Sequence, residues 1–353
     1  MPADISVKKI LKNNLITSSA PCRIDAGGTW DIKAMSISFE RWQPSTFNIA
    51  LNLRTTVSLL PFRDGMVRIT SEGFSDGVSC NTRNPDLSGP FAIFFAAVNY
   101  FGFSGLEIKI KSESPVKSAL GGSSTALIAL IKALAKLSEI IGSKMHFFKK
   151  DILNLGYHLE DGISGGNCGM QDQAAAVYGG VNGWLWNYGN RETPVKRDKL
   201  LDNNGMKELS KRLLVAYSGK WHVSASTNRG WLKNFLEGKT RNGWLEANNV
   251  VRELIESVKS MAWRESVRCI KEEMKIRCRI TPDALIPETT GLIKEAEKTG
   301  FGARFAGAGA GGSVWALGEP ENIDRLKAKW NKNLSKIKGA YILQCAVDPK
   351  GVI

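Results

Sequence analysis

A loop of small residues that leads directly into a long apolar helix pattern constrains this chain more than any other segment. Residues 114–127 have the sequence Ser-Pro-Val-Lys-Ser-Ala-Leu-Gly-Gly-Ser-Ser-Thr-Ala-Leu. Gly121 and Gly122 let the backbone approach a bulky anion without a Cβ in the way. The start of a helix adds unpaired N–H groups and the positive end of the helix dipole. The segment therefore predicts a phosphate-binding loop, although a tight turn with a serine N-cap would have a similar sequence.

The size and composition of the chain favour a globular protein of two domains. It has 353 residues, of which 43% are hydrophobic and 23% are charged. No apolar run reaches membrane-spanning length, and the segment from Met1 to Leu15 lacks the apolar core of a secretory signal. The six cysteines form no CxxC pair, which favours free thiols in a reducing compartment. We therefore expect a cytoplasmic protein with no membrane partner.

The net charge of +14 favours anionic partners such as nucleotides, sugar phosphates or nucleic acid. A basic run near the C-terminus resembles a nucleic-acid patch at first sight. However, Leu326, Trp330 and Leu334 recur within it at four-residue steps, as in an amphipathic helix with a solvated basic face. We therefore do not expect nucleic acid as a partner, and the sequence leaves a homodimer open.

Predicted strands and helices alternate in both halves of the chain, which indicates sheets layered with helices. In the first half, we predict strands at 15–25, 46–62, 65–72, 105–113 and 181–186, and helices at 89–101, 123–141, 149–161 and 169–178. In the second half, we predict strands at 213–217, 301–306, 313–317 and 340–346, and helices across 224–237 and 244–279 and at 287–299 and 321–333. The polar stretch 187–205 marks the junction, so we expect domains at 1–190 and 191–353.

Two further glycine motifs do not support other nucleotide folds. Residues 307–312 satisfy the dinucleotide pattern G-x-G-x-x-G, but a predicted strand follows them where that fold needs a helix. Gly238-Lys239-Thr240 resembles the end of a P-loop, but Lys233 stands where the upstream glycine is required.

The segment 20–31 brings polar side chains to the end of a predicted strand. The strand delivers Arg23 and Asp25, and a glycine turn then delivers Asp31. A guanidinium can hold an oxygen-rich ligand with two hydrogen bonds, and a carboxylate can accept from two neighbouring sugar hydroxyls. A salt bridge between strand and turn is the structural alternative.

The segment 162–173 places an acid after a flexible glycine turn, at the predicted start of a helix. From there Asp172 could accept the proton of a hydroxyl or orient that hydroxyl toward a phosphorus atom. The alternative is simple helix capping, because the dipole favours Asp in a first turn.

Together and in this order, these segments resemble the GHMP kinases, named for galacto-, homoserine, mevalonate and phosphomevalonate kinases. Residues 115–123 match the family's loop Pro-x-x-x-Gly-Leu-Gly-Ser-Ser, with departures at Ala119 and Gly122. Residues 306–313 match its C-terminal glycine motif, which lies against the nucleotide phosphates in the family. Residues 168–173 look like the galactokinase stretch Cys-Gly-x-x-Asp-Gln, whose Asp is the family's proposed base.

Two motifs resemble the heptose-phosphate and fucose kinase branch of that family. One is Gly-Gly-x-x-Gly-x-Gln-Asp-Gln at residues 165–173. The other is Ala20-Pro21-x-Arg23 followed by Gly27-Gly28-x-x-Asp31, although this turn is one residue shorter than usual. The resemblance implies an α+β fold of two domains, with an N-terminal domain like the second domain of a small-subunit ribosomal protein and a ferredoxin-like C-terminal domain. The active site would lie in the cleft between them.

The resemblance also implies roles for individual residues, with ATP and Mg²⁺ as cofactors. Asp172 would be the base or hydroxyl orienter, and Arg23 would bridge it to the transferring phosphoryl group. Ser123, Ser124 and Glu160 would bind Mg²⁺. The expected nucleotide-binding residues are Pro115, Ser118, Ala119, Leu120, Gly121, Gly122, Ser123, Ser124, Gly309 and Gly311. The expected substrate-binding residues are Asp25, Gly28, Asp31, Gly169, Gln171 and His222.

The implied reaction is transfer of the γ-phosphoryl group of ATP to a hydroxyl of a sugar or sugar phosphate. The branch resemblance favours a heptose 7-phosphate kinase-like enzyme. A galactokinase or fucokinase acting on a free sugar is the alternative. A non-catalytic nucleotide- or nucleic-acid-binding protein on a kinase scaffold is the alternative of another class, and it predicts salt-sensitive binding without phosphoryl transfer.

Overall fold

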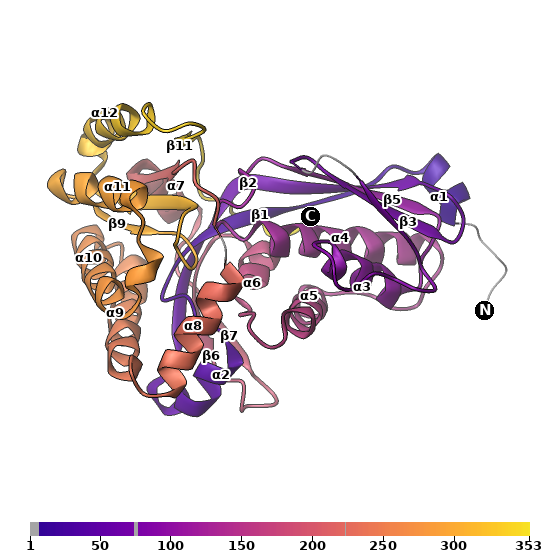
Figure 1. Cartoon of the computed structure of the whole chain (residues 1–353), viewed down its shortest axis with the longest axis horizontal. Helices are drawn as coiled ribbons and strands as arrows, with labels where there is room; N and C mark the ends of the chain where they lie inside the picture. The colour runs from indigo at the N-terminus through magenta and orange to yellow at the C-terminus, as the bar shows by residue number, and fades with distance from the viewer. Residues whose placement is uncertain (1–6, 74–76, 223) are drawn as a thin grey trace.

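The computed structural model describes residues 7–73, 77–222 and 224–353, which form two sheets with helices packed on them (Figure 1). The first sheet has seven strands. Six of them follow the order β4 (Val78–Asn81), β3 (Met66–Ser71), β5 (Leu106–Ser112), β2 (Ser45–Pro61), β6 (Val181–Trp186) and β7 (Val195–Lys199), and β1 (Ile16–Ala26) pairs with β2. The second sheet follows the order β11 (Tyr341–Leu343), β8 (Leu213–Tyr217), β10 (Ser313–Leu317) and β9 (Gly302–Phe305).

The long strand β2 organises the first sheet. It pairs antiparallel with β1 over the whole length of that strand, with β5 through residues 55–61 and with β6 through residues 45–49. The register of β1 on β2 shifts between Pro21 and Cys22, because proline cannot donate a ladder hydrogen bond and is tolerated at a bulge. Just beyond this bulge, the N–H of Arg23 donates to the carbonyl of Leu120 at 3.1 Å. The irregularity therefore joins β1 to the predicted phosphate-binding loop.

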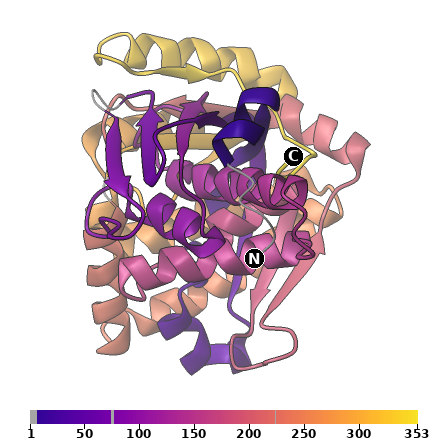
Figure 2. The same cartoon turned by 90° about the vertical axis from the view of Figure 1, so that its right-hand side faces the viewer.

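Helices cover the first sheet around α4 (Gly122–Ile140), which packs on β1 and β2 and is flanked by other helices (Figures 1 and 2). Most of α4 is buried, as its run of Ala, Leu and Ile predicts. The other helices that contact α4 are α3 (Ala92–Phe101), α5 (Lys149–Ser164) and α6 (Gln171–Tyr178). The short α1 (Val7–Asn13) contacts β2 and β5.

The helices of the second half pack on the second sheet and reach back to the first. Contacts join α10 (Trp263–Ile280) to β9, α11 (Pro287–Lys298) to β9 and β10, and α12 (Ile323–Leu334) to β8 and β11. Helix α9 (Arg241–Lys259) lies against α10 and β2, and thus joins the two halves. The remaining helices are α2 (Lys33–Ser36), α7 (Asn203–Arg212) and α8 (Ser224–Leu236), with 3-10 segments at Ile37–Trp42, Pro282–Ala284 and Pro320–Asn322. No helix of the described residues is long and apolar enough to cross a membrane.

The structure contains a strand or helix at each predicted position, and it differs from the prediction at the junction. Strand β7 lies inside the polar stretch 187–205, so the first sheet continues to Lys199 and the boundary falls after that strand. Its sequence Val-Lys-Arg-Asp-Lys is that of a solvated edge strand with almost no apolar alternation. The prediction also missed α1, α2, β4 and α7. Residues 244–279 form parts of two helices, α9 and α10, separated by a turn in which Met261 has a φ of 54°.

The C-terminal segment returns to the first sheet and connects the two halves through hydrogen bonds and an ion pair. The backbone of Ile353 exchanges two hydrogen bonds with that of Ser19, and Asp348 N–H donates to the carbonyl of Ala50. The Asp348 carboxylate also pairs with Arg54 at 2.5 Å. The first sheet is therefore held in part by residues from the C-terminal end of the chain, which follow the last strand of the second sheet.

Candidate active site

The predicted phosphate-binding loop connects β5 to α4 and has an unusual backbone. Lys117, Ala119 and Gly121 have φ values of 55°, 63° and 75°. Gly121 occupies the N-cap position, and no side chain caps the first turn of α4 in the described structure. The N–H groups of the first turn are therefore available to an anion, which the helix dipole also favours.

Ala119, where the resembled family usually has glycine, fits this backbone because a glycine faces it. A Cβ added to Gly312 would lie 2.6 Å from the Cβ of Ala119 and 2.7 Å from the carbonyl oxygen of Ser118. The C-terminal glycine loop thus packs directly on the phosphate-binding loop. The departure from the family pattern at Ala119 is accommodated by the absence of a side chain at Gly312.

Arg23 and Asp172 meet beside the phosphate-binding loop, although they come from β1 and α6. The guanidinium of Arg23 donates through Nε and Nη2 to Asp172 Oδ1 at 2.7 Å, and through Nη1 to the carbonyl of Ala119 at 2.6 Å. Burial would lower the pKa of Arg23, but the neighbouring carboxylates of Asp172 and Asp25 outweigh it and raise that pKa. A Cβ on Gly121 would lie 3.1 Å from Asp172 Oδ2, so Asp172 stands directly over the start of α4.

A second carboxylate lies on the other side of the α4 start. The hydroxyl of Ser124 donates to Glu160 Oε1 at 3.0 Å, and Gln173 Nε2 donates to Glu160 Oε2 at 2.6 Å. Burial raises the pKa of Glu160 to about 7, and no lysine or arginine of the described chain forms an ion pair with it. Ser123 is exposed on the same turn. A buried carboxylate and two hydroxyls, without a cation of their own, are the hard oxygen ligands that suit Mg²⁺.

Asp31 forms the opposite wall, and the position of its carboxylate requires a glycine at residue 169. Its carboxylate accepts from the N–H of Thr29 at 3.1 Å and from the N–H of Gln171 at 3.0 Å. A Cβ on Gly169 would lie 1.8 Å from Asp31 Oδ2, and a Cβ on Gly28 would lie 2.9 Å from Gln171 Nε2. Burial raises the pKa of Asp31 to about 7, despite the N–H donors that favour its charged form.

These groups surround one cavity of about 410 Å³ between the two halves of the molecule. Fifteen of the sequence-predicted residues line it: Arg23, Gly28, Asp31, Pro115, Ser118, Ala119, Gly121, Gly122, Ser123, Ser124, Glu160, Gly169, Gln171, Asp172 and His222. Three distant segments therefore converge on a single cleft.

Asp25 lies behind this cavity instead of lining it, which argues against the expected contact with substrate. Its side chain has no exposed surface and pairs with Arg304 at 3.2 Å and Arg23 at 3.4 Å. It also accepts from the N–H of Gly307 at 2.7 Å. Burial alone would raise the pKa of Asp25, but Arg23 and Arg304 lower it. Asp25 therefore holds β1 against the second sheet.

Leu120, Gly309 and Gly311 also lie outside the lining of the cavity. The Leu120 side chain is buried, and the backbone carbonyl of Leu120 accepts the hydrogen bond from the Arg23 N–H. Gly309 packs on Ala284, and its carbonyl pairs with His222 Nδ1. Gly311 approaches the carbonyl oxygen of Trp221. From the C-terminal glycine loop it is Gly307 and Ala308 that line the cavity.

Sequence reasoning missed the apolar end of the cavity. The apolar lining there comes from α3 and the two residues before it, from β5 and from the phosphate-binding loop, namely Pro90, Phe91, Phe94, Ile110 and Val116. Such residues are also expected in an ordinary core, so no local signal distinguishes them. Asn167 and Asn228 at the opposite end were missed as well, because isolated polar residues carry no pattern, and Cys168 was part of a matched motif without a predicted role.

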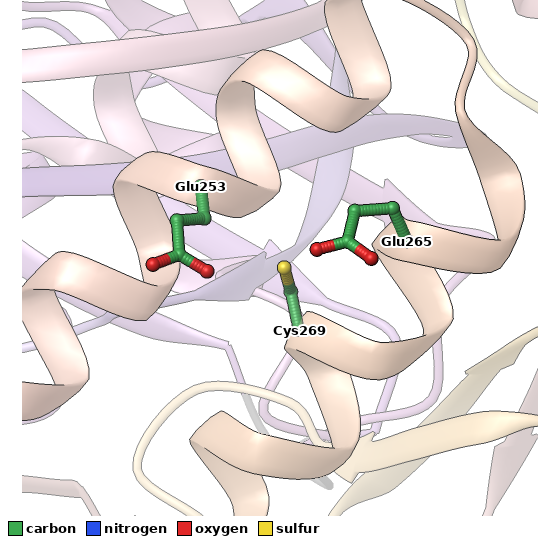
Figure 3. A group of neighbouring side chains, drawn as sticks. All are labelled: Glu253, Glu265 and Cys269. Carbon is green, nitrogen blue, oxygen red and sulfur yellow. The ribbon is translucent and has the colours of Figure 1, made fainter.

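A separate cluster of Glu253, Glu265 and Cys269 on α9 and α10 has the donor atoms of a metal site (Figure 3). Arg268 Nη2 lies 2.6 Å from a carboxylate oxygen of each glutamate. Both carboxylates thus already share a cationic partner from α10, and we interpret this cluster as a surface ion-pair network.

Comparison with known proteins identifies the family. A model of the N-terminal domain of the GHMP kinases matches residues 91–180, and a model of their C-terminal domain matches residues 240–336. Together the two models match more than half of the chain. The chain therefore belongs to the GHMP kinase family, and it is a phosphotransferase of a family that uses ATP. The two-domain fold expected from the sequence is confirmed.

Individual relatives are distant. Homoserine kinase from Caldanaerobacter subterraneus subsp. tengcongensis is 31% identical over 136 residues, which are 38% of this chain and 38% of that protein. Lactococcus lactis galactokinase complexed with galactose superposes with a TM-score of 0.74 at 16% identity, over 96% of this chain and 95% of the other. A D-glycero-D-manno-heptose 1-phosphate kinase from Bacteriodes thetaiotaomicron gives 0.69 at 16% identity, over 96% and 98%. At such identities the two structures show a common fold alone.

Proposed function

We propose that this protein is a sugar kinase, which transfers the γ-phosphoryl group of ATP to a hydroxyl of a sugar or sugar phosphate. The observation that carries the proposal is the contact between Arg23 and Asp172 at the start of α4. It places a cation and a proton acceptor next to helix N–H groups that suit phosphate oxygens. This arrangement supports phosphoryl transfer better than it supports nucleotide binding alone.

The two ends of the cavity suit the two substrates. The apolar end formed by α3, β5 and the loop offers a surface for the base of ATP, and the first-turn N–H groups of α4 would bind its phosphates. The acceptor would lie against Asp31, Gly28 and Gly169 with its hydroxyl facing Asp172. Mg²⁺ bound by Ser123, Ser124 and Glu160 would neutralise phosphate charge.

In the proposed reaction, the acceptor oxygen forms a bond to the γ-phosphorus while the bond from that phosphorus to the bridging β,γ-oxygen breaks and ADP leaves. Asp172 accepts the hydroxyl proton or orients the hydroxyl for attack. Arg23 holds Asp172 in place and adds positive charge beside the transferring group.

Two sugar classes remain as candidates for the acceptor. The branch resemblance supports a heptose phosphate, and the heptose 1-phosphate kinase fold agrees with it. The galactose-bound galactokinase fold agrees equally with a free sugar.

The test is ADP release from ATP and Mg²⁺ with galactose, fucose and heptose 7-phosphate, alongside homoserine and mevalonate as acceptors that are not sugars. Turnover with a sugar is the expected result, and turnover confined to homoserine or mevalonate would overturn the sugar assignment. ATP binding without turnover on any acceptor would favour the non-catalytic alternative.

A further inference from the structure

We infer that the acceptor is an uncharged polyhydroxylated molecule, such as a free sugar, and not a phosphorylated one. The inference rests on the proposed kinase function and concerns the same cavity. It follows from the charges around the acceptor end, which differ in sign from the net charge of the whole chain.

The acceptor end is lined by carboxylates. Asp31 and Asp172 both face the cavity from that side. Asp172 is paired with Arg23, but Asp31 forms no ion pair with a described lysine or arginine, although it is only 3% exposed. A phosphate placed beside Asp31 would meet a second negative group or force that carboxyl to take up a proton. Both alternatives lower the affinity for an anionic acceptor.

The arginine of the described lining is already engaged, and the lysine of that lining belongs to the phosphate-binding loop. The Arg23 guanidinium directs Nε and Nη2 to Asp172 and Nη1 to the Ala119 carbonyl, and it lies 3.4 Å from Asp25. The other described lysine or arginine of the lining is Lys117, whose ammonium lies over the Trp221 ring, 4.4 Å from its centre. The residues outside the description, 1–6, 74–76 and 223, include no lysine or arginine.

Two further basic side chains near the acceptor end do not offer a free positive charge. Lys33, two residues after Asp31, pairs with Asp161 at 3.2 Å and does not line the cavity. His222 does line it, but burial lowers its pKa, so the imidazole is neutral at pH 7. Phosphate sites in proteins typically contain an arginine cluster or a lysine with free hydrogen-bond donors. No arginine cluster lines the acceptor end among the described residues, and the lysine of the lining, Lys117, extends from the phosphate-binding loop over the Trp221 ring.

The remaining polar groups of this wall suit hydroxyls. Gln171 contacts Asp31 directly, and Ser164, Asn167 and Asn228 add neutral polar groups to the lining of the same cavity. A carboxylate flanked by amides can accept from adjacent hydroxyls of a sugar, and its buried oxygens lose partners when those hydroxyls are missing. Such a wall discriminates in favour of a neutral polyol.

The test compares each sugar with its phosphate ester. Phosphoryl transfer from ATP is measured at pH 8 for galactose, galactose 1-phosphate, galactose 6-phosphate and 6-O-methylgalactose, and for a heptose with and without its 7-phosphate. The methyl ether separates a blocked hydroxyl from a charge effect. We expect kcat/KM for the phosphorylated acceptor to be at least about tenfold below that of its uncharged counterpart. The variant Asp31→Asn should narrow this gap, whereas Asp64→Asn, which removes an exposed carboxylate outside the cavity, should not.

The outcomes separate the inference from the proposed function. If a sugar phosphate is phosphorylated more efficiently than the free sugar, the inference is overturned while the kinase function stands. If neither form of any sugar accepts phosphate, the proposed function fails and the inference fails with it. The wild-type comparison decides the matter even if Asp31→Asn does not fold.

Discussion

The two ends of the cavity are built in different ways. The phosphate-binding part of the nucleotide end is one continuous segment, the loop between β5 and α4, whose left-handed residues leave helix N–H groups free. The acceptor end is formed by side chains from β1, from the turn after it, from α6 and the segment before it, and from α8. Backbone groups bind a feature that all triphosphates share, whereas side chains distinguish one acceptor from another.

This difference has a consequence for mutations. Substitutions at the acceptor end should change which molecule reacts and how fast, with little effect on the binding of ATP. Substitutions at the start of α4 should change the use of ATP and Mg²⁺ with any acceptor. A variant that violates this division would show that the two ends are coupled, most directly through the contact of Arg23 with both Asp172 and the Ala119 carbonyl.

The largest expected effect is that of Asp172→Asn. The amide keeps the size of the side chain but cannot take up the hydroxyl proton, so kcat should fall by roughly 10²–10⁴. Binding of ATP should stay nearly intact, because the nucleotide end does not depend on this carboxylate. Steady-state kinetics and nucleotide titration measure the two quantities, and a near wild-type kcat would remove Asp172 from the proposed role.

A smaller effect is expected from Gly169→Ala. An added Cβ would lie 1.8 Å from Asp31 Oδ2, so the acceptor-binding carboxylate must move, and kcat/KM for the acceptor should fall by about 10². The matched control is Gly162→Ala on α5, where an added Cβ meets no atom within 4 Å. The KM for ATP should not change in either variant. Equal kinetics in the two variants would show that Asp31 is not in contact with the acceptor.

Much of the fold and of the phosphate-binding loop could be predicted from the sequence, because both depend on residues that are contiguous in the chain. The loop and its helix are contiguous, so their chemistry is visible as a pattern of glycine, serine and apolar residues. The acceptor end depends on convergence: Asp25 and Asp31 are six residues apart and equally plausible in sequence, yet one pairs with Arg304 and the other faces the cavity. The apolar end was not predictable, because Phe94 and Ile110 resemble core residues, and edge strand β7 lacks any apolar alternation.

At the nucleotide end, Ser123→Ala combined with Ser124→Ala should raise the Mg²⁺ concentration needed for half-maximal activity by about tenfold. The double variant loses two candidate metal ligands. It also loses the hydrogen bond that the Ser124 hydroxyl donates to the Glu160 carboxylate. Ser138→Ala, at the far end of α4, is the matched control. The relative rates on different acceptors should stay as in the wild type. An unchanged Mg²⁺ dependence would assign the metal to other residues.

The smallest expected effect is on the pH dependence of the free energy of unfolding, which should differ between Asp31 and an exposed acid. The folded-state pKa of Asp31 is about 7, above the value near 4 of an unfolded aspartate. Between these values the folded state binds more protons than the unfolded state, so the free energy of unfolding falls as pH rises from about 4 to 7. Asp31→Asn removes this contribution, and the variant should therefore gain stability relative to the wild type between pH 5 and pH 8. Urea unfolding at both pH values measures the difference, with Asp64→Asn as the control because that side chain is 82% exposed. If both variants keep the wild-type pH dependence, Asp31 is not buried without a cation, and the charge argument for a neutral acceptor loses its main support.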